Sequence, residues 1–294
     1  RTYSNNKYTS DSGAGGTALM TGHKVDNYHI ALGPDGTAFP SLLTTAHREL
    51  GKASGFVCTC TVLDATPAST YGHVTDRHLF DSLSMQMALC DHEVMIGADI
   101  KHFMPAHRKD GMAPIDTLEG RGYTMAYSMK DLLETQSSKI CALLSDDDAP
   151  GDAEKREHWL VPSTMKAITT LNQNPNGFVM MVEGSQIDWA GHNNDFPYML
   201  KELSEFEQTL AAILSFAEQD GHTLVVVTAD HETGGLTLNN GNIEDGTTTE
   251  PKFTTGSHTG VMVPVFAYGP GAERFSGIHE NTDFYNIILN LLRK

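Results

Sequence analysis

The sequence lacks any apolar run long enough to cross a membrane as a helix. No stretch of 18 or more consecutive apolar residues occurs in the 294 residues, so we expect no membrane span. Basic residues are scarce as well: 20 Lys and Arg stand against 37 Asp and Glu, and the formal charge is −17. Because nucleic acids are held by patches of Lys and Arg, this balance argues against a nucleic-acid partner. An acidic protein that handles an anionic substrate needs a local reversal of sign, which bound divalent cations supply.

Cysteine is sparse, with four residues in the chain. Cys58 and Cys60 lie in the apolar run Phe56–Val62, where the alternation of a strand puts both side chains on one face. Their spacing is not the C-x-x-C of a zinc knuckle or a redox motif. We therefore expect buried structural thiols.

Two catalytic motifs are absent. The chain has no G-x-S-x-G segment, so an α/β-hydrolase is unsupported. The segment HETGG at 231–235 lacks the HExxH spacing, which excludes the helical zinc site of that motif.

Strand-like and helix-like segments alternate through most of the chain. We expect strands at Ser54–Val62, Val94–Ala98, Lys139–Leu144, Gly177–Glu183, Thr223–Thr228 and Met262–Tyr268. We expect helices at Phe39–Leu50, Leu79–Cys90, Pro162–Asn172, Tyr198–Glu218 and Thr282–Leu292. Several strands are continuous apolar runs, as in parallel sheets covered on both faces. The pattern predicts an α/β fold, a three-layer α/β/α sandwich with a largely parallel central sheet.

The longest predicted helix has apolar residues at spacings of three and four, which predicts one apolar stripe. The stripe consists of Leu200, Leu203, Phe206, Leu210, Ile213 and Ala217.

Two stretches interrupt the regular pattern. Asp146–His158 is charged and contains Pro and Gly, and we expect an exposed connector there rather than a cation site. Asn239–Thr255 is rich in Gly, Asn and Thr and is predicted to be a surface excursion.

Ser12 lies in the glycine-rich segment DSGAGGTA, which leads into an expected helix at Thr17–Gly22. A serine in such a place commonly caps the helix. The functional alternative is a nucleophile, because a helix N-terminus favours an alkoxide and a bound phosphate.

Asp64 and Thr66 follow the first expected strand, and Arg77 comes shortly afterwards. Asp and Thr before a proline also cap ordinary turns, and Arg77 is equally compatible with a surface position. The functional alternative is that Arg77 binds a phosphate through two parallel hydrogen bonds from its planar guanidinium, which lysine cannot reproduce.

Glu183 ends an apolar strand, and Asp188 and His192 follow it at a spacing of i and i+4. In a helical turn these two side chains share one face, which suits chelation of one metal ion. The alternative is a solvated helix face.

Asp230 and His231 come at the end of another strand, directly before a Gly-Gly turn, and offer two adjacent metal ligands. His258 leads into the last expected strand. The chain has 14 histidines, so only their placement at strand ends separates His192, His231 and His258 from the others.

Taken in chain order, these five pieces resemble the alkaline phosphatase family. DSGAGGTALMTG is similar to the family's nucleophile segment, and DATPAS…HVTDR is similar to its phosphate-arginine segment. VEGSQIDWAGH, TADHETGG and SHTG…VPVFAYGPG are similar to its metal-binding segments. The resemblance runs from about Asp11 to Phe275 and implies a metal-dependent phosphomonoester hydrolase.

The resemblance also implies a role for each residue. Ser12 is the nucleophile that becomes a phosphoserine, Arg77 holds two phosphate oxygens, and Asp11 orients Arg77. One Zn²⁺ is held by Asp188, His192 and His258, and a second Zn²⁺ by Asp230 and His231. One Mg²⁺ contacts Thr66 and Glu183, with Asp64 nearby. Two zinc ions that flank an in-line displacement each offset negative charge on an entering or leaving oxygen.

The chain departs from the family pattern at two points. The family carries another Asp in a GDG-like segment of an N-terminal strand, and no such segment precedes Ser12. The chain starts at Arg1 with neither an initiator Met nor a signal peptide, so we expect the natural protein to be longer. Trp189 follows Asp188 where one branch of the family has Lys and others have Trp or His. Because Trp189 occurs together with Asp64, the sequence leaves the metal preference and the phosphate affinity open.

We expect residues 1–294 to form a single catalytic domain of this type, N-terminally truncated, with surface insertions near 100–160 and 239–255. The resemblance implies small-molecule phosphate monoesters as substrates. It also implies a homodimer and a periplasmic or secreted location.

Related metal-dependent enzymes are the nearest alternatives. A sulfatase needs a C/S-x-P-x-R motif, which is absent. Nucleotide phosphodiesterases generally place Thr where Ser12 stands and lack the Arg77 segment, and cofactor-independent phosphoglycerate mutases share the metal framework. A catalytically silent protein that binds metal or phosphate is an alternative from a different class.

Overall fold

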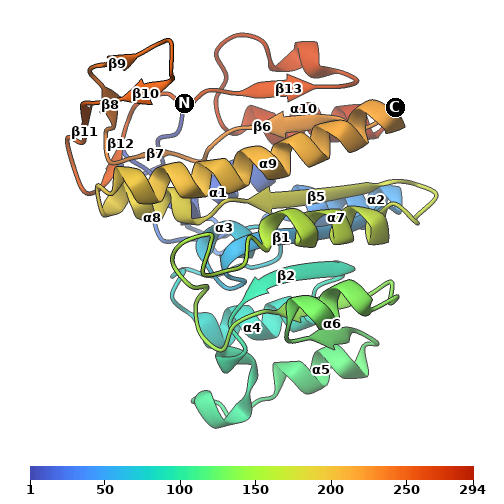
Figure 1. The fold of residues 1–294 in the computed structure, drawn as a ribbon. Helices are drawn as coiled ribbons and strands as arrows, with labels where there is room; N and C mark the ends of the chain where they lie inside the picture. The colour runs from blue at the N-terminus through green and yellow to red at the C-terminus, as the bar shows by residue number, and fades with distance from the viewer.

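The computed structural model describes all residues, 1–294, and its main feature is a five-stranded parallel sheet (Figure 1). The strand order is β3-β4-β2-β1-β5, with β1 Ala53–Thr61, β2 Val94–Ala98, β3 Thr124–Ala126, β4 Ile140–Leu143 and β5 Phe178–Glu183. The register of β1 and β5 runs from Ala53 opposite Phe178 to Cys58 opposite Glu183. The carboxyl ends of these two strands therefore lie at the same edge of the sheet.

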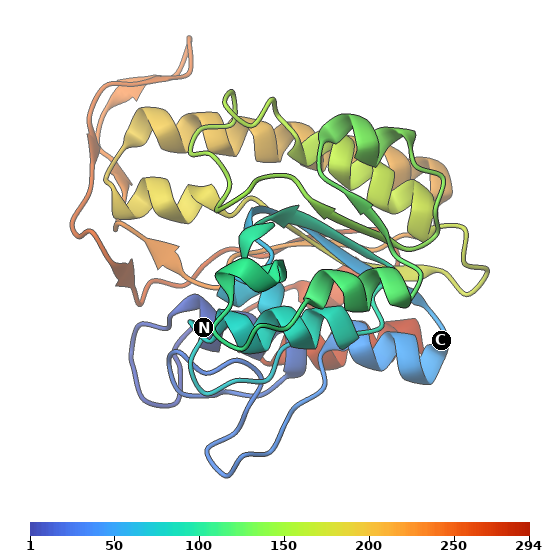
Figure 2. The same ribbon diagram turned by 90° about the horizontal axis from the view of Figure 1, so that it is seen from below.

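Helices cover both faces of the sheet, which confirms the predicted α/β/α sandwich. Figure 2 shows α6, α7 and α9 on one side of the sheet and α2, α4, α5 and α10 on the other. The helices are α1 Ser12–Thr21, α2 Leu42–Leu50, α3 Ala65–Ala68, α4 Phe80–Leu89, α5 Pro114–Gly120, α6 Met129–Glu134, α7 Leu160–Leu171, α8 Gln186–His192, α9 Phe196–Asp220 and α10 Asp283–Leu292. Short 3₁₀ turns occur at Lys101–Phe103, Pro105–His107 and Ala272–Phe275. No helix of the protein is long and apolar enough to cross a membrane.

The core has two main clusters, one on each face of the sheet, because side chains alternate along every strand. Phe56, Cys58 and Cys60 of β1 belong to one cluster, and Val57 belongs to the other. Cys58 and Cys60 are fully buried free thiols, as the sequence predicts.

The last two predicted strands do not join the main sheet. They shorten to β6 Val225–Val227 and β13 Phe266–Tyr268, which pair antiparallel in a ladder of their own. The remaining strands form two-residue pairs: β7 Glu232–Thr233 with β12 His258–Thr259, β8 Thr237–Leu238 with β11 Pro251–Lys252, and β9 Gly241–Asn242 with β10 Thr247–Thr248. The β8–β11 region corresponds to the predicted surface excursion near 239–255 and is largely exposed.

The predicted apolar stripe of α9 is wrong in its first two turns. Leu200 and Leu203 are 51% and 41% exposed, whereas Glu202 and Glu205 are buried. The two carboxylates lie inside because they pair with a buried cation, Arg156. This pairing offsets the cost of burying their charge, so the helix face predicted from apolar spacing is not the face that is buried.

The expectation of an exposed connector at Asp146–His158 is also wrong in part. Ala149, Ala153 and Arg156 of this segment are buried, and Arg156 is only 2% exposed. Within the wider stretch near 100–160, where we expected a surface insertion, β3 and β4 join the main sheet.

Candidate active site and metal centre

Ser12 is the first residue of α1, but it does not cap that helix. The cap is Asp11, whose Oδ1 accepts a hydrogen bond from the Ala14 amide at 3.1 Å. The Ser12 hydroxyl is therefore free of the capping role, and its Oγ lies 3.0 Å from Nε2 of His231. A hydroxyl at a helix N-terminus beside an imidazole is placed to act as a nucleophile.

Glycine brings the nucleophile segment close to the Asp230–His231 segment. A Cβ added to Gly15 would lie 2.9 Å from Cβ of Asp230, which is closer than side chains pack. The same holds for α8, where a Cβ added to Gly191 would lie 2.8 Å from the carbonyl oxygen of Thr233. Gly15 and Gly191 therefore allow the backbones of neighbouring segments to approach each other closely.

Arg77 is held between two carboxylates. Its Nη1 donates to Asp11 Oδ2 at 3.1 Å and its Nη2 donates to Asp64 Oδ1 at 2.6 Å. Burial opposes the charge, but Asp64 and Asp11 raise the pKa of Arg77 above its ordinary value, so it stays a cation. Asp64 also caps α3, with Oδ1 accepting from the Ala65 amide at 2.7 Å. Asp64 thus caps α3 and also pairs with Arg77.

His192 and His258 meet across the site through their Nε2 atoms, which are 3.0 Å apart. The Nδ1 atom of His192 lies 2.8 Å from the carbonyl of Gly256, and that of His258 lies 2.7 Å from the carbonyl of Ser10. A carbonyl partner makes each Nδ1 the protonated nitrogen, which leaves both Nε2 lone pairs facing each other. Two lone pairs that face each other at this distance repel, and a cation bound between them would stabilise the arrangement.

Asp188 completes this cluster. Its Oδ2 lies 3.5 Å from His192 Nε2 and its Oδ1 lies 3.4 Å from His258 Nε2. Burial opposes ionisation, but His258, His231, Thr233 and His192 lower the pKa of Asp188 to about 2. The ligand atoms of Asp188, His192 and His258 all lie within 4.8 Å of one another. One carboxylate and two imidazoles form a donor set that suits Zn²⁺.

Asp230 and His231 are adjacent to this cluster. The rings of His231 and His258 stack with their centroids 3.6 Å apart. Asp230 Oδ2 lies 3.1 Å from His231 Nε2, yet this buried oxygen has no hydrogen-bond partner. An orphaned buried carboxylate oxygen beside an imidazole fits a second cation.

Glu183 ends β5 and is joined by carboxylates from other segments. Burial, followed by the charges of Asp64 and Asp230, raises the pKa of Glu183 to about 8. The hydroxyl of Thr66 lies nearby and acts in the opposite direction. Oxygen donors of this kind suit Mg²⁺, and a bound cation would remove the repulsion among the carboxylates.

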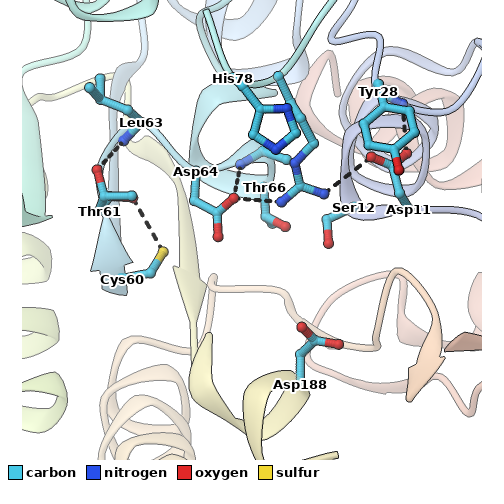
Figure 3. A network of polar contacts seen from close by, with 12 residues as sticks. Asp11, Ser12, Tyr28, Cys60, Thr61, Leu63, Asp64, Thr66, His78 and Asp188 are labelled. Atoms are coloured by element: carbon cyan, nitrogen blue, oxygen red, sulfur yellow. Dashed lines mark hydrogen bonds and ion pairs between the residues drawn. The ribbon is translucent and has the colours of Figure 1, made fainter. Parts of the chain in front are cut away.

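The structure brings all the predicted site residues to one end of the molecule. In Figure 3, Asp11, Ser12, Asp64 and Thr66 lie on one side, and Asp188 points toward them from the other. One supporting residue was missed in the sequence: Thr233, which donates to Asp188 Oδ1 at 2.5 Å and whose Oγ1 lies 3.2 Å from His231 Nδ1. Its place in the HETGG motif is the only signal that could have indicated it.

The fold and site together define an α/β protein with a serine nucleophile candidate beside a cluster of side chains that could hold metal ions. The family model described as "Alkaline phosphatase" matches residues 1–250 and 245–293. The chain therefore belongs to the alkaline phosphatase family of phosphate-releasing, metal-dependent hydrolases.

Individual relatives agree with this assignment. The chain is 31% identical to alkaline phosphatase 3 of Bacillus subtilis, over 97% of the chain and 77% of the relative. It is 28% identical to streptomycin-6-phosphate phosphatase of Streptomyces griseus, over 96% of the chain and 78% of the relative. The solved alkaline phosphatase of the Antarctic bacterium TAB5 has a TM-score of 0.91 and 35% identity, with 100% of this chain and 87% of that chain covered.

Proposed function

We propose that the protein hydrolyses phosphate monoesters and releases inorganic phosphate through a phosphoserine at Ser12. The observation that carries this proposal is the 3.0 Å contact between Ser12 Oγ and His231 Nε2 at the start of α1. The free amides of that helix end favour both the alkoxide and a bound phosphate. A capping serine would instead direct its hydroxyl to the backbone, and Asp11 already fills that role.

The reaction divides into two displacements. Ser12 gives up its hydroxyl proton to solvent and its Oγ attacks phosphorus. The bond between phosphorus and the ester oxygen breaks, and that oxygen takes up a proton from solvent to leave as the alcohol. Water then attacks the phosphoserine, the bond between phosphorus and Oγ breaks, and inorganic phosphate leaves with the serine regenerated. Each step exchanges one oxygen for another in line at phosphorus.

Arg77 binds the phosphate in this scheme. Its guanidinium offers two parallel donors that match two phosphate oxygens. Asp11 and Asp64 hold the guanidinium plane, and Asp11 does so while it also caps the helix of the nucleophile. The position of the phosphate binder is thereby coupled to that of Ser12.

The donor sets fit two zinc ions and one magnesium ion. Asp188, His192 and His258 would hold one zinc, Asp230 and His231 the second, and Glu183 and Thr66 the magnesium, with Asp64 nearby. When bound, such cations supply Lewis acidity that lowers the pKa of a hydroxyl or water and offsets charge on the leaving oxygen. A mutant TAB5 alkaline phosphatase, 36% identical to this chain, has been solved with Mg bound in its M3 site, which supports the magnesium assignment.

Family membership supports several finer proposals. We infer that the substrates are small-molecule phosphate monoesters, that residues 1–294 act as one catalytic domain, and that the protein works as a homodimer in the periplasm or after secretion. Light scattering coupled to size exclusion tests the homodimer, with a mass of one chain as the contradicting result.

Phosphate release from p-nitrophenyl phosphate at alkaline pH tests the function. We expect activity that a chelator removes and that Zn²⁺ with Mg²⁺ restores, and we expect Ser12→Ala to abolish it. Ser128→Ala is the matched control, because Ser128 caps α6 away from the site. Equal phosphate release by wild type and Ser12→Ala would contradict the nucleophile, and activity that survives chelation would contradict the metal centre.

A further inference from the structure

Arg156 forms a fully buried ion cluster on the connector between β4 and α7. Its Nη2 lies 2.6 Å from Glu202 Oε2 and 2.8 Å from Glu205 Oε2, both on α9. The Arg156 side chain is 0% exposed, and the two carboxylate side chains are 1% exposed. Two acids share one base, so each charge depends on the guanidinium for its stability in the interior.

The same guanidinium also contacts α8, the helix that carries Asp188 and His192. Arg156 Nη1 donates to Gln186 Oε1 at 2.7 Å, and the Tyr198 hydroxyl donates to the same oxygen at 2.5 Å. Gln186 is the first residue of α8 and is completely buried. Figure 1 shows α8 beside the start of α9. The buried cluster therefore links α9 to the start of α8.

The amide of Gln186 extends the link to β1. Its Nε2 donates to the carbonyl of Thr59 at 2.9 Å and to that of Ala149 at 3.3 Å. Nearby, Asp148 Oδ1 accepts from the Thr61 amide at 2.8 Å, so the connector itself is tied to the end of β1. That strand leads directly to Asp64 and Thr66. The connector thus joins the two segments that present candidate ligands from opposite sides of the site.

Such a link matters because α8 has only seven residues. A helix this short is not stable by itself, so its direction is set by tertiary contacts. A buried ion pair is weak evidence for stability, since well-packed apolar residues stabilise a core at least as well. Its directional hydrogen bonds, in contrast, fix the position of a neighbouring group.

We propose that Arg156 is a positioning residue for the metal centre. Through Gln186 it holds α8 so that Asp188 and His192 meet His258. The inference rests on the proposed function, because it concerns zinc held by these three side chains. The hydrogen bonds and ion pairs of Arg156 go to Pro150, Gln186, Glu202 and Glu205, none of which is a candidate metal ligand.

Zinc affinity, measured by competition with a chromophoric chelator, tests this role without any need for activity. The variants are Arg156→Lys, whose ammonium cannot contact the two glutamates and Gln186 with the geometry of a guanidinium, and Gln186→Met. The second variant keeps the ion pairs but removes the hydrogen bonds of Gln186 to Arg156, Thr59 and Ala149. The matched control is Arg108→Lys. Arg108 is another arginine with a fully buried side chain, paired with Asp110 at 2.6 Å, and its hydrogen bonds and ion pairs go to residues outside α8 and α9.

We expect both test variants to bind zinc about 10- to 100-fold more weakly than wild type, as for groups that orient metal ligands, while Arg108→Lys stays near wild type. Wild-type affinity in Gln186→Met, or an equal loss in Arg108→Lys, would overturn the positioning role. If Arg156→Lys fails to fold, Gln186→Met alone decides. A wild-type protein that binds no zinc would overturn the proposed metal centre and this inference together, whereas wild-type binding with unaffected variants overturns only this inference.

Discussion

Ser12 and His231 are 219 residues apart in the chain, and their side chains lie 3.0 Å from each other. The contact joins the first turn of α1 to the segment that follows β6. It exists because a glycine of α1 lets the helix approach Asp230, the neighbour of His231. The site thus depends on backbone packing as much as on its reactive side chains.

Gly15→Ala should reduce phosphate release about tenfold or more, since small misplacements of reacting groups have effects of this size. The added methyl carbon would stand 2.9 Å from Cβ of Asp230 and force the two segments apart. Gly120→Ala is the control, because a Cβ at Gly120 of α5 meets nothing within 4 Å. That control should keep full activity and gain roughly 0.5–1 kcal/mol of stability. Equal activity of both variants in the p-nitrophenyl phosphate assay would speak against the close-approach explanation.

Arg77→Lys should lower kcat/KM for p-nitrophenyl phosphate by roughly 10- to 100-fold, because an ammonium cannot contact two phosphate oxygens in one plane. It also cannot reach Asp11 and Asp64 at the same time with the geometry of the guanidinium. Arg48→Lys is the control, since Arg48 is exposed and pairs only with Asp91. Steady-state kinetics with inorganic phosphate as a competitive inhibitor separates the loss of phosphate binding from loss of the chemical step. Unchanged inhibition by phosphate in Arg77→Lys would refute the binding role.

The preference between monoesters and diesters tests the substrate class. We expect a higher kcat/KM for p-nitrophenyl phosphate than for bis-p-nitrophenyl phosphate, because a monoester has three non-bridging oxygens, two for Arg77 and a third for the proposed cations, whereas a diester has only two. The comparison uses one preparation with identical metal content. Clearly faster turnover of the diester would favour a phosphodiesterase of the same superfamily.

His92 should make the protein sensitive to acid. It is 1% exposed, with Nδ1 2.9 Å from Ser54 Oγ, and burial lowers the pKa of His92 from 6.5 to about 4. Between these values the unfolded chain binds a proton that the folded protein does not, so the free energy of unfolding falls as the pH drops through this window. The full effect is about 3 kcal/mol.

Urea unfolding of wild type and His92→Gln at pH 7 and at pH 5 measures this contribution. We expect wild type to lose more stability between the two pH values than the variant, because the other titrating groups are common to both. Parallel losses in the two proteins would show that His92 does not control the acid sensitivity.

Much of the architecture could be predicted from local patterns. Apolar runs such as Val94–Ala98 have the same bounds in the structure, because a buried parallel strand must be apolar on both faces. The ends of β1 and β5 lead into candidate ligands in the sequence and in the structure alike. Short elements such as β3 and α8 were harder, since three to seven residues carry too little periodicity to be distinguished from a turn.

The burial of charged residues could not be predicted from local patterns. A charged segment with Pro and Gly is normally solvated, and for this reason Arg156 was expected in an exposed connector. The periodicity of α9 likewise favoured Leu200 and Leu203 as core residues over Glu202 and Glu205. Burial of a charge depends on whether an opposite charge from a distant part of the chain comes within reach, and no local pattern contains that information.

The sequence by itself determined the α/β class, the alkaline phosphatase family, and the identity of the chemical groups near the site, because these follow from hydrophobic period and from motif order. Tertiary structure alone decided that Asp11 rather than Ser12 caps α1, that β6 and β13 pair outside the main sheet, and that a buried arginine links α9 to α8. The physical reason is the same in all three cases. Each outcome depends on competition between partners that are far apart in the chain and meet only when it folds.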